Sequence, residues 1–498
     1  MLLERDEERP AARTISTRIV IVGTGFAGLG MAIKLRQAGI TDFVVLERAR
    51  DIGGTWRDNG YPGCACDIPS QLYSFSFARN TEWSRVFPTQ PEIHAYLKRC
   101  AQKYKIEQHV RYESDVIEAR YDAQHVRWRV ETRGGTAYEA PVLVSGMGGL
   151  SNPAMPDVPG VETFAGPRFH SAQWRHDVEL GGKRVAVIGT GASAIQFVPQ
   201  IAPIVGSLAL FQRTPPWIVP KLDGPVDARK KKLLRWLPGY AWLQRTLIYV
   251  QHEVRALGFT VNPRILGLVE KIAKKHLARQ IADPALRAKV TPTYKLGCKR
   301  ILISNDYYPA LTRENVTLVT GPIVRVEADA VVTADGTRHV ADVLIYGTGF
   351  RAQDGLSPVR VVGEGGRTLD DAWAEGMQAY LGTSIAGFPN FFTLVGPNTG
   401  LGHNSMVYMI ESQIAYVLDA LAQMKKRGAR ALDVRADVQH AFNVELHNRT
   451  KRTIWQSGCK SWYLDKNGNN SSLWPGFTFD FRRRTRKIEP GRYRWIGR

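Results

Sequence analysis

The chain has 498 residues, of which 44% are hydrophobic and 23% are charged, so it is long enough for roughly two to four globular domains. No run of about 18 apolar residues occurs and the N-terminus is charged, so we expect neither a membrane-spanning helix nor a secretory signal. The formal net charge is +21, yet no nucleic-acid-binding motif accompanies the basic clusters at residues 229–232 and 482–487. We therefore expect a cytoplasmic protein without a nucleic-acid partner, with a disordered tail over residues 1–17.

The cysteine pattern indicates neither a disulfide framework nor a metal site. The five cysteines are few and scattered, and they fit a reducing compartment: Cys64, Cys66, Cys100, Cys298 and Cys459. No spacing of metal-ligating side chains stands out, so we expect no metal ion.

The first motif along the chain is a glycine-rich turn, residues 23–28, which follows the apolar run 18–22. Glycines between a strand and a helix let backbone N–H groups approach a pyrophosphate at the helix N-terminus. The next predicted strand, 43–46, ends in Glu47, whose carboxylate can accept a ribose 2′-hydroxyl. This pattern predicts that FAD is bound by Gly23, Gly25, Phe26, Ala27, Gly28 and Glu47.

A second glycine-rich turn, residues 189–194, lies about 166 residues further on and follows the apolar run 184–188. The next predicted strand, 207–211, ends in Gln212-Arg213-Thr214 and carries no acid. A carboxylate at this place would repel a 2′-phosphate, whereas arginine attracts one. The second turn therefore predicts NADPH binding by Gly189, Gly191, Ala192, Ser193, Arg213 and Thr214.

This order of elements predicts an α/β fold with two Rossmann-like dinucleotide-binding domains. The FAD-binding domain is expected to be discontinuous, over residues 18–150 and 351–498, and the NADP-binding domain to cover 151–221 and 291–350. A helix-rich insert, 222–290, interrupts the second domain and carries apolar and aromatic residues among basic ones. It is either an amphipathic surface in weak peripheral contact with a membrane or, as is more common, a helical subdomain packed on its neighbour.

Four further segments carry a resemblance to a known family. Residues 164–174 have the pattern FxGxxxHxxxW, and residues 54–67 have the pattern GxWxxxxYPGxxxD. Gly297-Cys298-Lys299-Arg300 and Gly347-Thr348-Gly349-Phe350 complete the set. Together, over residues 18–476, the chain resembles the Baeyer–Villiger monooxygenases. One departure is Arg175, where the family usually has Pro or Asp.

The resemblance implies an NADPH- and FAD-dependent monooxygenase that inserts one oxygen atom of O₂ into a ketone through a C4a-peroxyflavin, giving an ester or lactone. It implies that Arg300 stabilises the negative charge that develops, since guanidinium stays charged and points several donors in one plane. Asp67 would pair with Arg300 and position it.

The same resemblance implies the remaining site residues. Flavin contacts would come from Thr55, Trp56, Asp67, Tyr73 and Met406. NADPH contacts would come from Lys299 and from Trp462 on a mobile loop. A hinge between the domains, with a conformational role, would include Phe164, Gly166, His170 and Trp174.

Three alternatives stay open at this point. A flavin-dependent N- or S-monooxygenase would act on amines or sulfides, and the departure at Arg175 is compatible with it. A flavin disulfide reductase would use the same two cofactors and a cysteine pair, but the spacing Cys64-x-Cys66 is unusual for that class. A basic binding protein with vestigial cofactor sites is disfavoured by the intact glycines. The expected partners are a small-molecule ketone, or a sulfide, and O₂.

Overall fold

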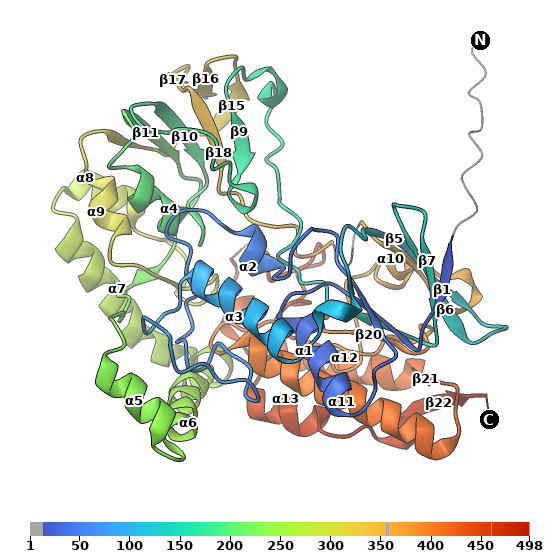
Figure 1. Ribbon diagram of the computed structural model, residues 1–498. Coiled ribbons are helices and arrows are strands. Elements are labelled where there is room, and N and C mark those ends of the chain that lie inside the picture. Colours follow the sequence, from blue (N-terminus) through green and yellow to red (C-terminus); the bar gives the residue numbers. More distant parts are fainter. Residues whose placement is uncertain (1–12, 355, 357, 460, 498) are drawn as a thin grey trace, which may run out of the picture.

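The computed structural model describes residues 13–354, 356, 358–459 and 461–497. The ribbon forms two lobes, each built on a parallel sheet, with a group of helices beside both of them (Figure 1). The chain passes from the first lobe to the second and then returns to the first, which makes the first lobe discontinuous in sequence.

The first lobe centres on a five-stranded parallel sheet with the order β20-β8-β2-β3-β4. Its strands are β2 (Ile19–Val22), β3 (Val44–Leu46), β4 (Val110–Arg111), β8 (Val142–Ser145) and β20 (Phe391–Thr393). Most of these residues are apolar and buried, as a sheet covered on both faces requires. Because β20 pairs with β8, the C-terminal part of the chain completes the sheet that the N-terminal part begins.

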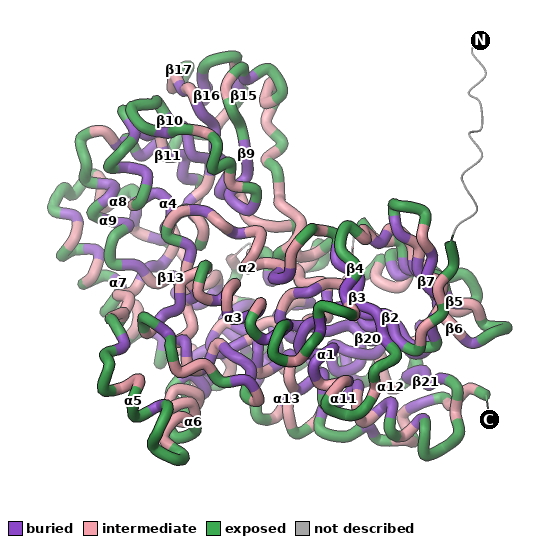
Figure 2. Tube along the Cα trace, in the orientation of Figure 1, coloured by how far each residue is buried: buried purple, intermediate pink, exposed green. Residues whose placement is uncertain are grey.

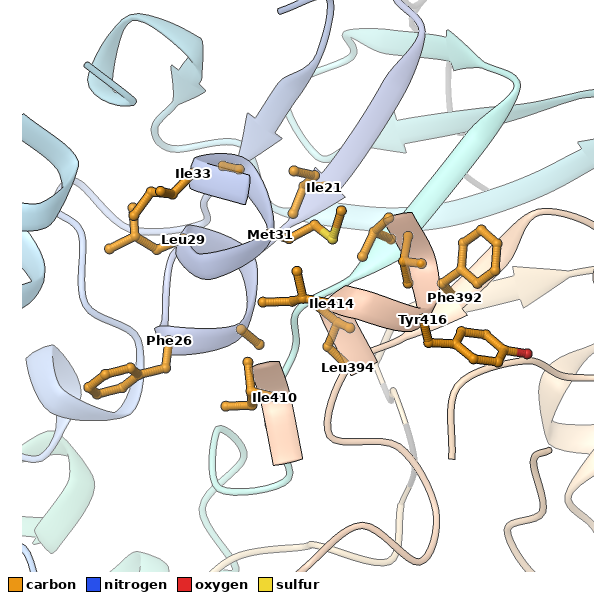
Figure 3. Close-up of a cluster of buried hydrophobic side chains, with 14 of the residues drawn as sticks. Ile21, Phe26, Leu29, Met31, Ile33, Phe392, Leu394, Ile410, Ile414 and Tyr416 are labelled. Atoms are coloured by element: carbon orange, nitrogen blue, oxygen red, sulfur yellow. The ribbon is translucent and has the colours of Figure 1, made fainter. Parts of the chain in front are cut away.

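Two long helices cover one face of this sheet and form the main core with it (Figure 3). They are α1 (Phe26–Gln37) and α11 (Met406–Arg427), which contact each other. Met31, Ile414 and Phe392 are buried between the helices and the sheet. Gly30 permits the close approach, because a Cβ at this position would lie only 3.0 Å from the Cδ1 of Ile414.

The other face of the central sheet packs against a second sheet with the order β1-β7-β6-β5-β19. Its strands are β1 (Thr14–Ser16), β5 (Val116–Asp122), β6 (Arg127–Thr132), β7 (Ala137–Ala140) and β19 (Arg360–Val362). The disordered tail expected over residues 1–17 is therefore wrong at its end, because residues 14–16 pair in parallel with the edge strand β7. Residues 1–12 lie outside the described residues.

The remaining elements of the first lobe surround these two sheets. The helices are α2 (Thr55–Asp58), α3 (Gln90–Lys103), α10 (Leu369–Ala372), α12 (Ala436–Thr450) and α13 (Thr478–Thr485). A two-stranded antiparallel sheet consists of β21 (Ala431–Val434) and β22 (Tyr493–Ile496). The two lobes also contain short 3₁₀ helices, which are η1 (Glu107–His109), η2 (Val161–Thr163), η3 (Ser171–Gln173), η6 (Glu364–Gly366), η7 (Ile454–Gln456) and η8 (Pro490–Arg492).

The second lobe has its own five-stranded parallel sheet with the order β14-β11-β10-β18-β9. The strands are β9 (Arg168–His170), β10 (Arg184–Ile188), β11 (Ser207–Phe211), β14 (Val316–Val319) and β18 (Val343–Tyr346). A meander of β15 (Ile323–Val326), β16 (Ala330–Thr333) and β17 (Arg338–Val340) and the helices α4 (Ala194–Ile201) and α9 (Tyr307–Leu311) accompany it. Two parallel sheets, each with a glycine-rich turn after a central strand, confirm the predicted α/β class.

A helical segment interrupts the second lobe between β12 (Ile218–Val219) and β13 (Leu302–Ile303), which pair with each other. It contains α5 (Ala228–Trp236), α6 (Tyr240–Val254), the short π-helix η4 (Leu257–Val261), the 3₁₀ helix η5 (Pro263–Ile265), α7 (Leu266–Gln280) and α8 (Pro284–Val290). In Figure 2, α5 and α6 are coloured mainly as exposed or intermediate. No helix in the described part of the chain is long and apolar enough to cross a membrane.

The contact between α1 and α11 gives a test of what holds the first lobe together. Ile414→Ala should lower the free energy of unfolding by about 2–5 kcal/mol, because it leaves a cavity where Gly30 and Phe75 cannot close in. Denaturant titration measures this change. Ile204→Ala, at a largely exposed position, should change it by less than about 0.5 kcal/mol. Equal losses in the two variants would contradict this account of the core.

Candidate active site

A cleft with about 1220 Å³ of empty space, its open mouth included, lies at the carboxyl ends of β2, β3 and β8. Parallel-sheet proteins bind dinucleotides at this edge. Nine of the residues predicted to contact FAD line the cleft: Gly23, Gly25, Phe26, Ala27, Glu47, Thr55, Trp56, Tyr73 and Met406. Gly28 lies behind the turn, where a Cβ would come within 1.9 Å of the Gly23 carbonyl oxygen.

The glycines of this cleft keep two pieces of backbone close together without filling the space between the turn and its neighbours. Gly23 has a φ of +94°, which favours glycine, and a Cβ on it would lie 3.2 Å from the Gly146 carbonyl oxygen. Gly54 has a φ of +52°, and a Cβ on it would lie 3.1 Å from the Cα of Gly25. Side chains at these places would push the turn away from its neighbours, and both glycines line the cleft, so the residues present fit a bound dinucleotide.

Glu47 is buried at the end of β3, and its carboxylate accepts hydrogen bonds from Thr24, Arg57 and the backbone N–H of Ala49. Its Oε2 accepts hydrogen bonds from the backbone N–H of Thr24 at 3.0 Å and from the Thr24 hydroxyl at 2.6 Å. Its Oε1 accepts one from Arg57 at 2.9 Å. Desolvation acts against the charge of Arg57, but Asp58 and Glu47 outweigh it and raise the pKa of the guanidinium. Sequence reasoning missed Arg57, because no local signal links it to Glu47.

Asp67 and Arg300 form an ion pair between the two lobes. The Nε of Arg300 donates to Oδ2 of Asp67 at 3.1 Å, and Nη2 donates a second, shorter hydrogen bond to the same oxygen. The two side chains are 31% and 37% exposed, so they are packed on one side and open on the other. The geometry predicted from the motifs, a cation held by an acid, is present.

The charges of this pair change the pKa values around it. Desolvation acts to raise the pKa of Asp67, but the charge of Arg300 outweighs it and lowers that pKa. The Asp67 carboxylate raises the pKa of Arg300, so the guanidinium stays protonated. Burial raises the pKa of Tyr73, and the charges of both Asp67 and Arg300 act on it as well. Tyr73 lines the flavin cleft, so the charges of the ion pair act on a side chain of that cleft.

Three further side chains surround the pair, and sequence reasoning did not find them. Burial raises the pKa of Tyr463 to about 12, and Arg300 acts on the same hydroxyl. Burial lowers the pKa of His252 to about 4, and its ring Nδ1 donates to the carbonyl of His403 at 3.1 Å. Desolvation lowers the pKa of Arg255, against the opposing charge of Asp67. These residues come from the helical segment and from the chain before α13, far from Asp67 in sequence.

The second glycine-rich turn lies at the carboxyl end of β10. Gly189 has a φ of +108°, and a Cβ on it would lie 2.4 Å from the Gly347 carbonyl oxygen, whereas a Cβ on Gly191 would lie 3.8 Å from the same oxygen, an ordinary contact. Ala192 is exposed and Ser193 is half-buried. The backbone carbonyl of Thr214 accepts from the Thr190 hydroxyl at 3.4 Å, which places the end of β11 beside the turn.

Two predicted phosphate ligands are brought together from distant parts of the chain. Desolvation lowers the pKa of Lys299, and the positive charge of Arg213 lowers it further, so the two cations are near each other. The ammonium of Lys299 lies 4.9 Å from the centre of the Tyr294 ring. Neither cation has an ion-paired acid in the described residues, and two neighbouring positive charges suit a doubly charged phosphate. Trp462 is 45% exposed, and its carbonyl accepts from Gln353 at 2.6 Å.

The FxGxxxHxxxW residues pack within the second lobe. Phe164 is buried, and a Cβ on Gly166 would lie 2.2 Å from the Asp342 carbonyl oxygen. The Nδ1 of His170 accepts from the backbone N–H of Ala172 at 3.1 Å, and burial lowers the pKa of the ring. Trp174 packs against Phe197 at 5.3 Å between ring centres. These contacts are structural, and none of them involves Asp67 or Arg300.

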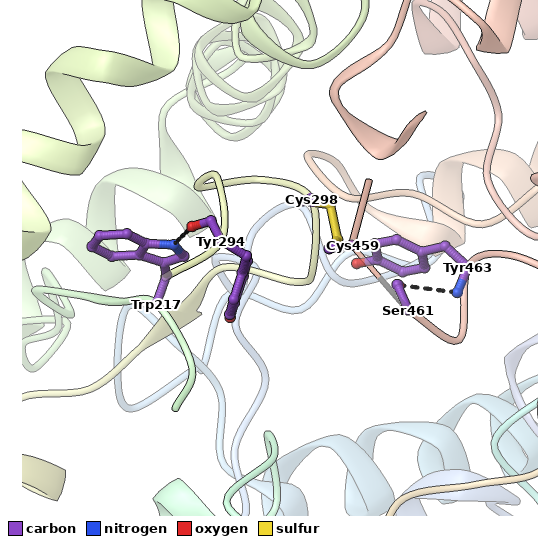
Figure 4. The surroundings of a disulfide bond; sticks show 6 residues. All are labelled: Trp217, Tyr294, Cys298, Cys459, Ser461 and Tyr463. Carbon is purple, nitrogen blue, oxygen red and sulfur yellow. Dashed lines mark hydrogen bonds between the residues drawn. A yellow bond between two sulfur atoms is a disulfide. The ribbon is translucent and has the colours of Figure 1, made fainter. Parts of the chain in front are cut away.

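A disulfide joins Cys298 to Cys459, which are 161 positions apart in sequence (Figure 4). Sequence analysis did not expect it, because disulfide partners so far apart leave no local signal. The bond ties the segment that carries Lys299 and Arg300 to the segment that precedes Trp462. Cys64 and Cys66 are free and buried, and desolvation raises the pKa of Cys64 to about 12, which disfavours a reactive thiolate there.

A family model described as pyridine nucleotide-disulphide oxidoreductase matches residues 20–218. Two curated proteins named Baeyer-Villiger monooxygenase, from Pseudomonas aeruginosa and Streptomyces coelicolor, are each 51% identical over 96% of this chain and cover 91% and 92% of their own lengths. The chain belongs to the Baeyer–Villiger monooxygenase family. A solved steroid monooxygenase bound to NADP is 31% identical, with a TM-score of 0.86 over 97% of this chain and 100% of that one. Cyclohexanone monooxygenase from Rhodococcus sp. Phi1, bound to NADP⁺, is 28% identical, with a TM-score of 0.88 over 98% and 100%.

Membership in the Baeyer–Villiger monooxygenase family confirms the resemblance drawn from the motifs and the expected two-cofactor architecture. It also favours ketone oxygenation over the N- or S-oxygenating alternative. The match to the pyridine nucleotide-disulphide oxidoreductase model covers the two glycine-rich turns and the chain between them. The roles of the single residues in this Baeyer–Villiger monooxygenase stay predictions.

The disulfide can be tested by counting thiols. Denatured, unreduced protein should expose three thiols, those of Cys64, Cys66 and Cys100, and reduction should raise the number to five. Cys459→Ser should lower the free energy of unfolding by about 2–4 kcal/mol, because the unfolded chain loses a long closed loop. The unmodified protein should lose the same amount on reduction, while the variant should not respond to the reductant. Five thiols before reduction would show that the bond does not form.

Proposed function

We propose that this chain is an NADPH- and FAD-dependent monooxygenase that inserts one oxygen atom of O₂ into a ketone, giving an ester or a lactone. The observation that carries this proposal is the ion pair between Asp67 and Arg300, beside the cleft whose residues fit FAD. The bound flavin, when reduced by NADPH, supplies the activation of O₂. The protein supplies the remaining requirements: a positive charge at the reacting oxygen, sites that position the coenzyme, and walls that determine which ketones enter.

Arg300 supplies a fixed positive charge where the reaction builds negative charge. Addition of oxygen to a ketone carbonyl creates an oxyanion, and preorganised donors in a partly closed site stabilise such a charge strongly. Nε and Nη2 of Arg300 both donate to one oxygen of Asp67, so the remaining N–H groups of the guanidinium are not used by this carboxylate. Because its pKa is raised by Asp67, Arg300 stays charged across the ordinary pH range.

NADPH is proposed as the reductant on the strength of the second glycine-rich turn. The charge of Arg213 acts on Lys299 and no acid directly follows β11, which supports a 2′-phosphate bound by these two cations. Trp462 would cover the nicotinamide side of the coenzyme, and the hinge of Phe164, Gly166, His170 and Trp174 would let the lobes move. A cytoplasmic location stays a prediction from the sequence.

The ketone itself is proposed only as a class. The solved relatives include enzymes titled steroid monooxygenase and cyclohexanone monooxygenase, whose names indicate ketones of very different size. The walls around Asp67 and Arg300 come partly from the helical segment, through His252 and Arg255. Such walls differ among members of one fold without changing its chemistry.

Arg300→Ala should impair oxygen transfer more than flavin reduction. Under anaerobic conditions NADPH should still bleach the flavin, because hydride transfer does not need the oxyanion-stabilising cation. In air, ester formation should fall by about 10²–10³, the usual cost of one missing oxyanion donor. Rapid mixing, with reduction and reoxidation recorded separately, and product analysis by mass spectrometry measure both steps.

Two companion variants make the Arg300 test specific. Arg300→Lys should retain more ester formation than Arg300→Ala, since it keeps the charge, and Asp67→Asn should impair the same step less, since it leaves the cation. Ester formation by Arg300→Ala at a near-normal rate would remove the main support for the proposed function.

NADPH should be preferred over NADH, and Arg213 should carry part of the preference. Arg213→Ala removes a charge-assisted hydrogen bond worth about 1.5–3 kcal/mol, which corresponds to a roughly tenfold to hundredfold higher KM for NADPH. The KM for NADH should stay nearly unchanged, because NADH has no 2′-phosphate. Arg313→Ala, an exposed arginine in the same lobe, is the control. Equal use of both coenzymes by the unmodified enzyme would contradict the assignment.

A further inference from the structure

Helix α6 directs a stripe of apolar side chains into solvent. Leu243, Leu247, Val250 and Val254 are each about half exposed. Their spacing of four, three and four residues places them on one face of the helix. Within the described residues no other element covers this face, and Figure 2 shows the region of α5 and α6 at the periphery of the molecule.

The opposite face of α6 is polar and points inward. Arg245 donates to the carbonyl of Gln71 at 2.8 Å, and the hydroxyl of Tyr249 lies 3.1 Å from that of Thr478. The carboxylate of Glu253 accepts from the Asn404 side chain at 2.6 Å and from the Thr478 hydroxyl at 2.7 Å. Polar contacts therefore hold α6 to the first lobe, which leaves its apolar face without a partner.

The neighbouring helix end adds large side chains to this surface. Trp236 at the end of α5 is 75% exposed and Trp242 near the start of α6 is 63% exposed, and α5 and α6 contact each other. Leu237 between them is exposed as well. Several large apolar side chains are thus exposed on two adjoining helices, which is typical of an interaction site when they lie together. Tryptophan in particular favours the boundary between an apolar phase and water.

The charge of the same segment indicates which kind of partner can bind the exposed apolar face. Residues 228–254 contain six lysines and arginines, Arg229, Lys230, Lys231, Lys232, Arg235 and Arg245, and one acid, Glu253, which is buried. Arg235 pairs with Glu82, whereas Arg229, Lys230 and Lys232 have no ion-pair partner in the described part of the chain. Two copies of this face would bring like charges together, which opposes self-association. A surface of anionic headgroups over an apolar interior matches both the charge and the exposed side chains.

We propose that the α5–α6 hairpin, residues 228–254, is a peripheral docking surface for an anionic lipid membrane. The two tryptophans and the α6 stripe enter the boundary between headgroups and acyl chains, and the lysines of α5 contact the phosphates. The lobes stay in water, since no described helix can cross the membrane. This surface lies outside the cofactor cleft, so docking does not depend on the proposed reaction.

Co-sedimentation of the FAD-loaded enzyme with lipid vesicles tests the proposal. The protein should pellet with vesicles of equal parts phosphatidylglycerol and phosphatidylcholine at low salt. It should pellet much less at high salt, because screening weakens the lysine contacts, and much less with phosphatidylcholine alone. Absence of binding to the anionic vesicles at low salt, or equal binding to both kinds of vesicle, would overturn the proposal.

Matched variants separate this surface from general stickiness. Leu247→Ser/Val250→Ser should lower the vesicle partition coefficient about tenfold or more, because two side chains no longer enter the apolar boundary. Ile204→Ser/Val444→Ser, at positions of similar exposure elsewhere (56% and 43% against 55% and 49%), should leave it unchanged. Equal losses in both double variants would contradict the assignment to α6.

A serine variant that folds poorly would be recognised by its low FAD content. In that case two double variants that reverse surface charges still test the proposal. Lys230→Glu/Lys232→Glu should abolish the preference for anionic vesicles, whereas Lys425→Glu/Lys426→Glu at the end of α11 changes the net charge equally and should preserve it. Sedimentation velocity without lipid addresses the competing occupant. A dimer that Leu247→Ser/Val250→Ser dissociates would assign this face to a second copy and overturn the membrane proposal.

Discussion

The ion pair between Asp67 and Arg300 depends on how the two lobes are placed, because each partner comes from a different lobe. The chain before Asp67 leaves the first lobe and packs on α4 of the second. There the Tyr61 hydroxyl donates to the Gln196 side chain at 2.9 Å, and Gln196 donates to the carbonyl of Ala65 at 3.0 Å. A Cβ on Gly63 would lie 2.7 Å from the Gln196 carbonyl oxygen, so this contact needs glycine. A rotation of the lobes that broke these hydrogen bonds would also withdraw Asp67 from Arg300. The ion pair between Asp67 and Arg300 therefore depends on the angle between the two lobes.

Local signals were enough to predict the parts of the site that follow strands. Strand ends at Glu47 and Arg213 are visible because a buried apolar run stops at a polar residue. Arg57, His252 and Tyr463 could not be found in this way, since their place near Glu47 or Asp67 depends on long-range packing. The same holds for the disulfide, whose cysteines are 161 residues apart, and for β1, which exists only because β7 offers it an edge. Motif recognition supplied Arg300 and Asp67, and the structure supplied what surrounds them.

The helical segment shows a different limit of sequence reasoning. Periodicity in α6 defines an apolar face and a polar face, and the usual rule would turn the apolar face inward. Here the groups that receive α6 on the first lobe are a backbone carbonyl, a hydroxyl and an amide, at Gln71, Thr478 and Asn404. Buried polar groups of this kind must be paired, so they select the polar face of the helix. The expectation of a helical insert is met, but which face it shows to solvent follows from the chemistry of the surface that receives it.

The distribution of charge, more than its total, determines what the basic clusters do. The cluster at residues 482–487 lies partly on α13, where carboxylates face it: Arg484 pairs with Glu445 at 2.8 Å and with Asp480 at 3.2 Å. Arg482 pairs with Glu411 at 3.4 Å and its guanidinium lies 3.5 Å from the centre of the Tyr408 ring. These arginines are used within the fold. No ion pair involves the cluster at residues 229–232 on α5 in the described part of the chain, so its field extends into solvent over about one Debye length, roughly 8 Å at physiological salt. Two clusters of similar density in the sequence thus differ in the field that they present to solvent, because a charge that is paired within the protein contributes little to attraction outside it.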